Sequence, residues 1–140
     1  MRHHTSGRAP AIPAVVALVA LAGPFAASPA WADWTLVSSA DGTSHFIDPV
    51  TLRKDGALRR VWELASTEHA SKGGAASHRM LIEYDCAAQR YRLLMLTAYT
   101  EPMAAGKVFA TTSHAPSAAQ WHDAKPGTVS WDALQQVCRL

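Results

Sequence analysis

The sequence has 140 residues, enough for one domain, and 13 Lys and Arg residues stand against 11 Asp and Glu. Arg2 and Arg8 lie in an N-terminal segment that we expect to be removed, which leaves 11 basic and 11 acidic residues in residues 33–140. A protein that binds nucleic acids needs a basic surplus to neutralise phosphates. The balanced charge therefore argues against nucleic acid as a partner.

Residues 1–32 have the pattern of a secretory signal peptide. The two arginines precede an uncharged stretch, residues 9–32, which is rich in Ala, Val and Leu and ends in Ala30-Trp31-Ala32. This order predicts cleavage after Ala32. A membrane span is the alternative, but four prolines leave only residues 14–23 uninterrupted, well short of the roughly 20 residues that a span needs. No cysteine near the cleavage site could carry a lipid, so we expect a periplasmic or secreted protein without a membrane anchor.

The exported part, residues 33–140, begins with a predicted hairpin. Residues 34–37 and 44–47 flank Asp41-Gly42, and Asp-Gly between two β-prone runs is a strong hairpin signal. Pro49 favours a turn or a single helical turn over residues 48–52.

A turn at residues 54–56 then leads into a third predicted strand, residues 58–65. Apolar and charged residues alternate imperfectly along this strand, so the pattern does not predict which of its faces is buried. Residues 67–77 lack both periodicity and large apolar side chains, which predicts an exposed, mobile loop.

The fourth and fifth predicted strands, residues 79–86 and the run that begins at Arg90, specify their own register. A connection at residues 87–88 or 86–89 sets the following pairs opposite each other: Asp85 with Arg90, Tyr84 with Tyr91, Glu83 with Arg92, Ile82 with Leu93 and Met80 with Met95. One face then carries opposite charges and the other aromatic and aliphatic pairs, an agreement that a shift of one residue destroys. We interpret the charges as ion pairs on a solvated face rather than as an acid–base site.

The last third of the chain predicts one more strand and a helix. The strand covers residues 107–111, and Trp121 precedes a turn at residues 125–128. Residues 130–140 predict a short helix with Ser130 as its N-cap and one apolar side. That side carries Trp131, Leu134, Val137 and Cys138.

Cys86 and Cys138 are the only cysteines in the sequence. In an exported protein such a pair is oxidised, so we predict a disulfide between the end of the fourth strand and the helix. A helix of this length is marginal by itself. Its apolar side and the disulfide together are expected to hold it on the sheet.

The ordered set of these features resembles the surface-adhesin protein E family over essentially all of residues 33–140. The resemblance rests on Trp34, the run Phe46-Ile47-Asp48, Arg60-Val61-Trp62, Glu83-Tyr84-Asp85-Cys86, residues 90–93, Gly106-Lys107-Val108, Trp121, Pro126-Gly127 and Val137-Cys138. It implies a mostly β, α+β fold: a six-stranded antiparallel sheet with a C-terminal helix tied by the disulfide to its concave side. It also implies binding to host extracellular-matrix or serum proteins, dimer formation in some members, and no cofactor or catalytic residue.

No catalytic or metal-binding pattern competes with this interpretation. The five histidines of residues 33–140 lack zinc-ligand spacing, and the sequence has no nucleophile-elbow, zinc-protease or phosphate-loop motif. A cysteine in a disulfide cannot act as a nucleophile. We therefore predict no enzyme, no cofactor and no metal.

Two binding functions remain open. The first is a protein-binding module that uses a sheet edge or an apolar face that one short helix cannot cover, with a candidate surface at Trp62, Tyr84, Tyr91, Tyr99 and Trp121. The second is a periplasmic carrier of a small ligand, held in a groove between helix and sheet. A sealed interface would exclude the carrier, and an enclosed cavity of about a few hundred Å³ would favour it.

Overall fold

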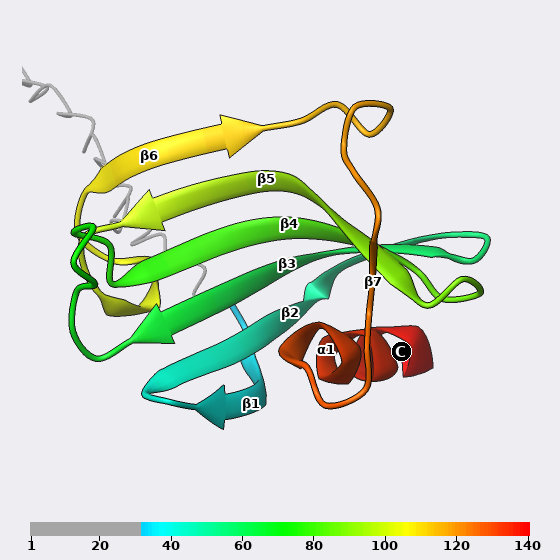
Figure 1. Ribbon diagram of the computed structural model, residues 1–140, viewed down its shortest axis with the longest axis horizontal. Coiled ribbons are helices and arrows are strands. Elements are labelled where there is room, and N and C mark those ends of the chain that lie inside the picture. The colour runs from blue at the N-terminus through cyan, green and yellow to red at the C-terminus, as the bar shows by residue number, and fades with distance from the viewer. Residues whose placement is uncertain (1–31) are drawn as a thin grey trace, which may run out of the picture. The chain divides into compact units, whose positions relative to one another are not determined.

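The computed structural model describes residues 32–140, which form an antiparallel sheet with one helix packed on it (Figure 1). Six strands follow one another across the sheet in chain order: β1 (Thr35–Ala40), β2 (Thr43–Asp55), β3 (Leu58–Thr67), β4 (Ser77–Asp85), β5 (Arg90–Tyr99) and β6 (Val108–Ser113). The predicted fold class is confirmed. Apart from Ala32, the predicted signal peptide lies outside the described residues.

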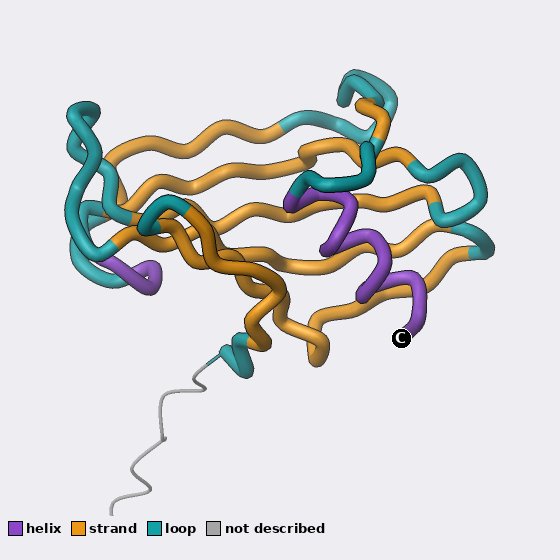
Figure 2. Tube along the Cα trace, turned by 60° about the horizontal axis from the view of Figure 1, so that its bottom comes forward, coloured by secondary structure: helices purple, strands orange, loops and turns teal. Residues whose placement is uncertain are grey.

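Two elements at the end of the chain complete the fold. The two-residue strand β7 (His122–Asp123) pairs with Tyr91 and Arg90 at the start of β5, and the sequence pattern did not predict it. Helix α1 (Val129–Arg139) lies across one face of the sheet, as Figure 2 shows. Within the described part of the chain, no helix has the length and apolar character that crossing a membrane requires.

The first hairpin forms where the sequence predicts it. β1 and β2 meet at Asp41 and Gly42, whose φ angles are 52° and 75°. Positive φ at both central residues is the requirement of the turn that matches the natural strand twist, and Asp-Gly meets it at little cost.

The turn predicted at residues 48–52 is wrong, because β2 continues through this segment as a bulge between Asp48 and Arg53. Pro49 has no N–H to donate, which suits a bulge. The Thr51 hydroxyl donates to the Asp48 carbonyl at 2.7 Å and accepts the Trp62 N–H at 3.1 Å. The Thr51 hydroxyl thus replaces a backbone hydrogen bond that is missing at the bulge, and β2 continues beyond it.

The predicted register of β4 and β5 is confirmed for the four pairs from Asp85–Arg90 to Ile82–Leu93. The fifth pair is wrong, since Met80 lies opposite Leu96 and Leu81 opposite Met95. The register shifts between Leu81 and Ile82, where β5 has one extra residue. An insertion of this kind leaves no clear mark in an apolar run.

The core lies between α1 and the sheet. Ile47, Val61, Ile82 and Tyr84 pack there against four buried residues of the C-terminal segment, namely Ala124, Ala133, Leu134 and Val137. The disulfide between Cys86 and Cys138 is present, so the predicted attachment of the helix is confirmed.

The helix begins earlier than predicted. Thr128, not Ser130, is the N-cap: its backbone is extended, and its side chain accepts a hydrogen bond from the Trp131 N–H at 3.3 Å. Ser130 already belongs to the first helical turn, where its own backbone is helical. Both residues are good cap formers, so composition alone did not distinguish them.

We call the face of the sheet opposite α1 the open face; it includes Trp62 and Leu81, which alternate with the core residues Val61 and Ile82. A short 3-10 turn, η1 (Pro102–Ala104), covers one end of it. The hydroxyls of Ser66 and Ser77 hold this turn by accepting the N–H groups of Met103 and Ala104, each at 2.9 Å. Most of the open face has no second layer.

The long loop between β3 and β4 is exposed as predicted over residues 68–74. Ala75 and Ala76 at its end are buried, because the Ala76 N–H donates to the Tyr99 carbonyl and draws the chain back to the sheet. Its mobility stays a prediction.

Candidate functional site

A groove of about 780 Å³ lies between the sheet and the start of α1 and opens to solvent. We call it the helix-side groove. Residues 121–130 form one wall, and the sheet contributes His45, Glu63, Met80, Ile82, Tyr84 and Tyr91. The segment that forms this wall is positioned by β7 pairing and by the Ala124 N–H, which donates to the Gln89 carbonyl at 3.0 Å.

Glu63 is the buried acid of this groove. It lies on β3 between Ile47 and Met80, and only 9% of the residue is exposed. The Tyr84 hydroxyl donates a hydrogen bond to Glu63 Oε1. Burial raises the pKa of Glu63 to about 7, against the opposing effect of that hydrogen bond. The carboxyl thus titrates near neutral pH, above the ordinary glutamate range.

Three rings line the groove next to this carboxyl. The ring centroids of Tyr84 and Tyr91 are 6.2 Å apart, and those of Tyr91 and His122 are 5.6 Å apart. Burial and the neighbouring Glu63 raise the pKa of Tyr84 well above its usual value, so its phenol stays protonated. Burial lowers the pKa of His45, which is therefore neutral at neutral pH. The groove combines an acid, aromatic faces and an apolar floor.

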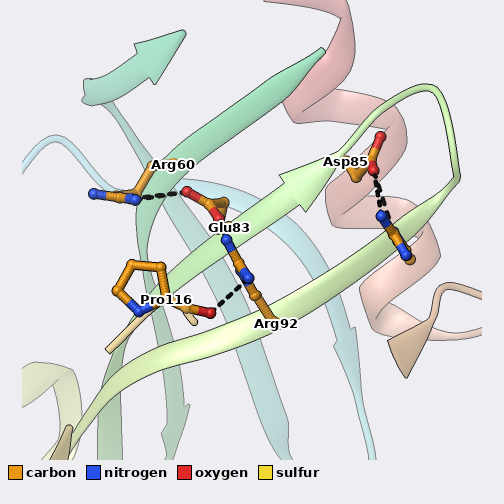
Figure 3. A network of polar contacts seen from close by, with 6 residues as sticks. Arg60, Glu83, Asp85, Arg92 and Pro116 are labelled. Carbon is orange, nitrogen blue, oxygen red and sulfur yellow. Dashed lines mark hydrogen bonds and ion pairs between the residues drawn. The ribbon is translucent and has the colours of Figure 1, made fainter. Parts of the chain in front are cut away.

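A second polar cluster lies on the open face and contains the other buried glutamate (Figure 3). Arg60 donates to Glu83 Oε2 from Nε and Nη2 at 3.2 and 2.6 Å, and Arg92 Nε donates to Oε1 at 2.8 Å. Arg92 Nη1 also donates to the Pro116 carbonyl at 2.6 Å. The prediction of ion pairs is confirmed, but Glu83 is not on a solvated face, since its side chain is only 5% exposed.

Tryptophan rings extend this cluster along the open face. The Arg79 guanidinium lies 4.2 Å from the centroid of Trp62, and those of Arg90 and Arg92 lie 4.5 and 4.2 Å from that of Trp121. The side chain of Arg90 is 40% exposed, whereas its partner Asp85 is 13% exposed. The side chains of Arg60 and Arg90 are thus partly exposed at the open face, while the indole rings are half-buried under arginines and the paired acids lie beneath.

The structure divides the predicted binding residues between different places. Trp62 lies on the open face, where the Arg79 guanidinium stacks on it. Tyr84, Tyr91 and Trp121 line the helix-side groove together, and Tyr84 is 1% exposed. Arg90 and Arg92 also stack on Trp121, which therefore lies between the groove and the open face. Tyr99 lies at the far end of β5, opposite Ser77. The five residues therefore form no single surface.

Sequence reasoning missed Glu63 and His122 as members of a site. The sequence carried a signal for Glu63. It lies two residues after Val61, so both side chains are on the same face of β3, and that face is the buried one. In the described residues, no group of three or more His, Cys, Asp or Glu is arranged to hold a metal ion.

Two solved structures are similar to this chain in fold. Crystal form II of Haemophilus influenzae protein E has a TM-score of 0.54 and 15% identity, and the match covers 74% of this chain and 91% of that chain. The selenomethionine form of the same Haemophilus influenzae protein has a TM-score of 0.51 and 14% identity, with 74% and 90% covered. At this identity the likeness concerns the fold alone. None of the curated proteins compared with the chain matches it.

The family comparison covers most of the sequence. The family model described as Surface-adhesin protein E matches residues 34–139, which span every element from β1 to the end of α1. The match confirms the resemblance seen in the sequence. The chain belongs to the surface-adhesin protein E family.

Proposed function

We propose that the protein is an exported, non-enzymatic adhesin that binds another protein through the open face of its sheet. The observation that carries this proposal is the uncovered face itself, on which arginines stacked on tryptophan reach solvent. Membership of a family of surface adhesins supports it. A host matrix or serum protein is the partner class that we propose, and a second copy of the chain is the alternative occupant.

The chemistry of the open face defines the partner segment. A hollow of about 410 Å³ lies beside Trp62 and Leu81, and Val50 at its edge is 73% exposed. Trp and Arg are the residue types that most often dominate binding energy at protein interfaces. Exposed guanidinium groups select acidic residues. The proposed partner segment therefore carries a carboxylate beside an apolar side chain.

The test compares two surface valines. We expect Val50→Asp to abolish capture of matrix or serum proteins, because the new carboxylate lies beside Arg53 and Arg60 in the hollow, competes for their guanidinium groups and repels an acidic partner. Val108→Asp is the matched control, since Val108 on β6 is 57% exposed and lies outside the hollow. The captured protein is identified by mass spectrometry and its binding measured with purified components. Equal binding by both variants would contradict the proposal, and dimers lost only in Val50→Asp would point to the second copy.

Export is part of the proposal. We propose cleavage after Ala32, which leaves residues 33–140 in the periplasm or outside the cell without an anchor. N-terminal sequencing of the exported protein should begin at Asp33. Retention of Trp31 in the exported chain would contradict the cleavage site.

A second candidate function is a carrier of a small ligand in the helix-side groove. The favouring observation is its volume of about 780 Å³, which falls in the usual range for ligand sites. The groove is neither the sealed interface that would exclude a carrier nor a fully enclosed cavity.

A further inference from the structure

Glu63 is a buried acid without a positively charged partner. The ion pairs of the described residues join Arg60 and Arg92 to Glu83 and Arg90 to Asp85, and none includes Glu63. The Tyr84 hydroxyl bonds Oε1, and among residues 32–140 no side chain donates to Oε2. Buried carboxylates are normally paired or fully hydrogen-bonded. A cation from outside the chain would complete this site.

The surroundings of Glu63 determine what kind of cation fits. Metal ions of biological sites take several oxygen, nitrogen or sulfur ligands, and the described residues offer no such group here. Instead the carboxyl lies beside Tyr84 and Tyr91, whose ring is followed by that of His122. Aromatic faces attract organic cations, and Met80 and Ile82 add apolar lining. An acid next to aromatic rings and aliphatic side chains suits an ammonium group attached to an apolar body.

The other ionisable groups of the groove leave this assignment intact. They come from every element around it: His45 on β2, Tyr84 on β4, Tyr91 on β5, His122 and Asp123 on β7, and Lys125 in the segment before α1. Tyr84 stays protonated and His45 neutral for the reasons given above. Lys125 and Asp123 are of opposite sign two residues apart, and neither forms an ion pair with Glu63.

We propose that the helix-side groove binds a small organic ammonium ion, with its charged nitrogen at the Glu63 carboxylate and its apolar body against Tyr91 and Met80. This assignment rests on the second candidate function, the carrier, and is independent of the open face. Because the carboxylate must be ionised to receive the cation, ligand binding displaces a proton wherever Glu63 is protonated. Binding therefore strengthens as the pH rises through about 7.

The test uses two probes of almost the same shape, 2-phenylethylammonium and the uncharged 2-phenylethanol. Calorimetry on the exported protein with its disulfide intact should show saturable binding of the ammonium probe, at least about tenfold tighter than the alcohol. The ammonium probe should bind more weakly at about pH 5.5 than at about pH 8. Near pH 7 the measured enthalpy should depend on the buffer, because a proton is released.

Variants locate the probe. Glu63→Gln keeps the shape of the side chain and should weaken ammonium binding about tenfold and abolish the pH dependence. Tyr91→Leu tests the aromatic wall and should weaken binding while the pH dependence remains. Glu68→Gln, at an exposed acid of the β3–β4 loop, is the matched control and should change nothing.

Three results would overturn the assignment: no saturable binding of the ammonium probe up to about 10 mM, equal binding of the alcohol, or unchanged binding by Glu63→Gln. Circular dichroism checks that each variant is folded. Val50→Asp, which tests the open face, should leave ammonium binding unchanged. Failure of the groove assignment and failure of the protein-binding proposal are thus separate outcomes.

Discussion

Each face of the sheet buries one glutamate, and the pKa values of the two glutamates are shifted in opposite directions. Burial alone would raise the pKa of Glu83, but hydrogen bonds and charges from Arg60 and Arg92 outweigh it and lower that pKa. Glu63 has only the Tyr84 hydroxyl, and burial raises its pKa to about 7. An acid with two cationic partners contributes to the fold, whereas an acid without one costs stability at neutral pH. We infer that Glu83 has a structural role, and the cost of burying Glu63 agrees with the cation binding proposed for the helix-side groove.

The largest expected effect on stability comes from removing the disulfide. This change should alter the surroundings of Glu63 and leave those of Glu83 as they are. Cys86→Ser should lower the free energy of unfolding by about 2–5 kcal/mol, as is usual for small exported domains. Loosening α1 hydrates the helix-side groove, so the pKa of Glu63 should move back toward its ordinary value while Glu83 is unaffected. Urea unfolding and carboxyl titration by NMR measure the two quantities. Two free thiols in the natively expressed protein would contradict the bridge.

Removal of the Glu83 charge should give the next largest effect. Glu83→Gln leaves Arg60 and Arg92 without their counter-charge and should destabilise the fold by about 3 kcal/mol. We take the low end of the range because the side chain of Arg60 is 42% exposed and partly screened by water. The folded-state pKa is lowered, so the stabilisation is present above the ordinary glutamate range and disappears in acid. Denaturant unfolding at neutral pH checks the magnitude.

The same substitution at Glu63 should have the opposite effect on stability. A raised folded-state pKa means that the unfolded chain ionises first, so the wild-type protein loses stability as the pH rises from about 4.5 to about 7. Glu63→Gln removes that loss and should stabilise the protein by about 3 kcal/mol at about pH 8, with little change at about pH 4. Urea unfolding across this range, with Glu68→Gln as control, measures it. A destabilising Glu63→Gln at the higher pH would show that the carboxylate has a protein partner after all.

Local signals predicted much of the fold. Asp41-Gly42 determines the first hairpin through two positive φ angles, and the charges of Glu83 and Asp85 determine the register of β4 against Arg90 and Arg92. These features depend on neighbours in one hairpin. The disulfide joins distant segments and was predictable for a different reason, since only two cysteines exist.

What the sequence concealed depends on contacts between distant segments. The bulge in β2 is held by Thr51, whose hydroxyl accepts the Trp62 N–H from the next strand. Glu63 is surrounded by residues of β2, β4 and the segment before α1, so its burial becomes visible only when the covered face is known. The solvated ion pair predicted at Glu83 became a buried one because Arg60 joins from β3.

The smallest expected effect concerns the more exposed neighbour of Glu83, the pair Asp85–Arg90, with a distance of 3.0 Å between Oδ2 and Nη2. The Ala88 N–H and then Arg90 lower the pKa of Asp85, so Asp85→Arg removes a backbone acceptor as well as an ion pair. Exchanging both charges, Asp85→Arg with Arg90→Asp, restores the pair but not that acceptor. We therefore expect the double variant to lose less stability than the sum of the two single variants, by about 0.5 kcal/mol. Strictly additive free energies of unfolding would mean that this ion pair, unlike the buried cluster at Glu83, contributes nothing to the stability of the fold.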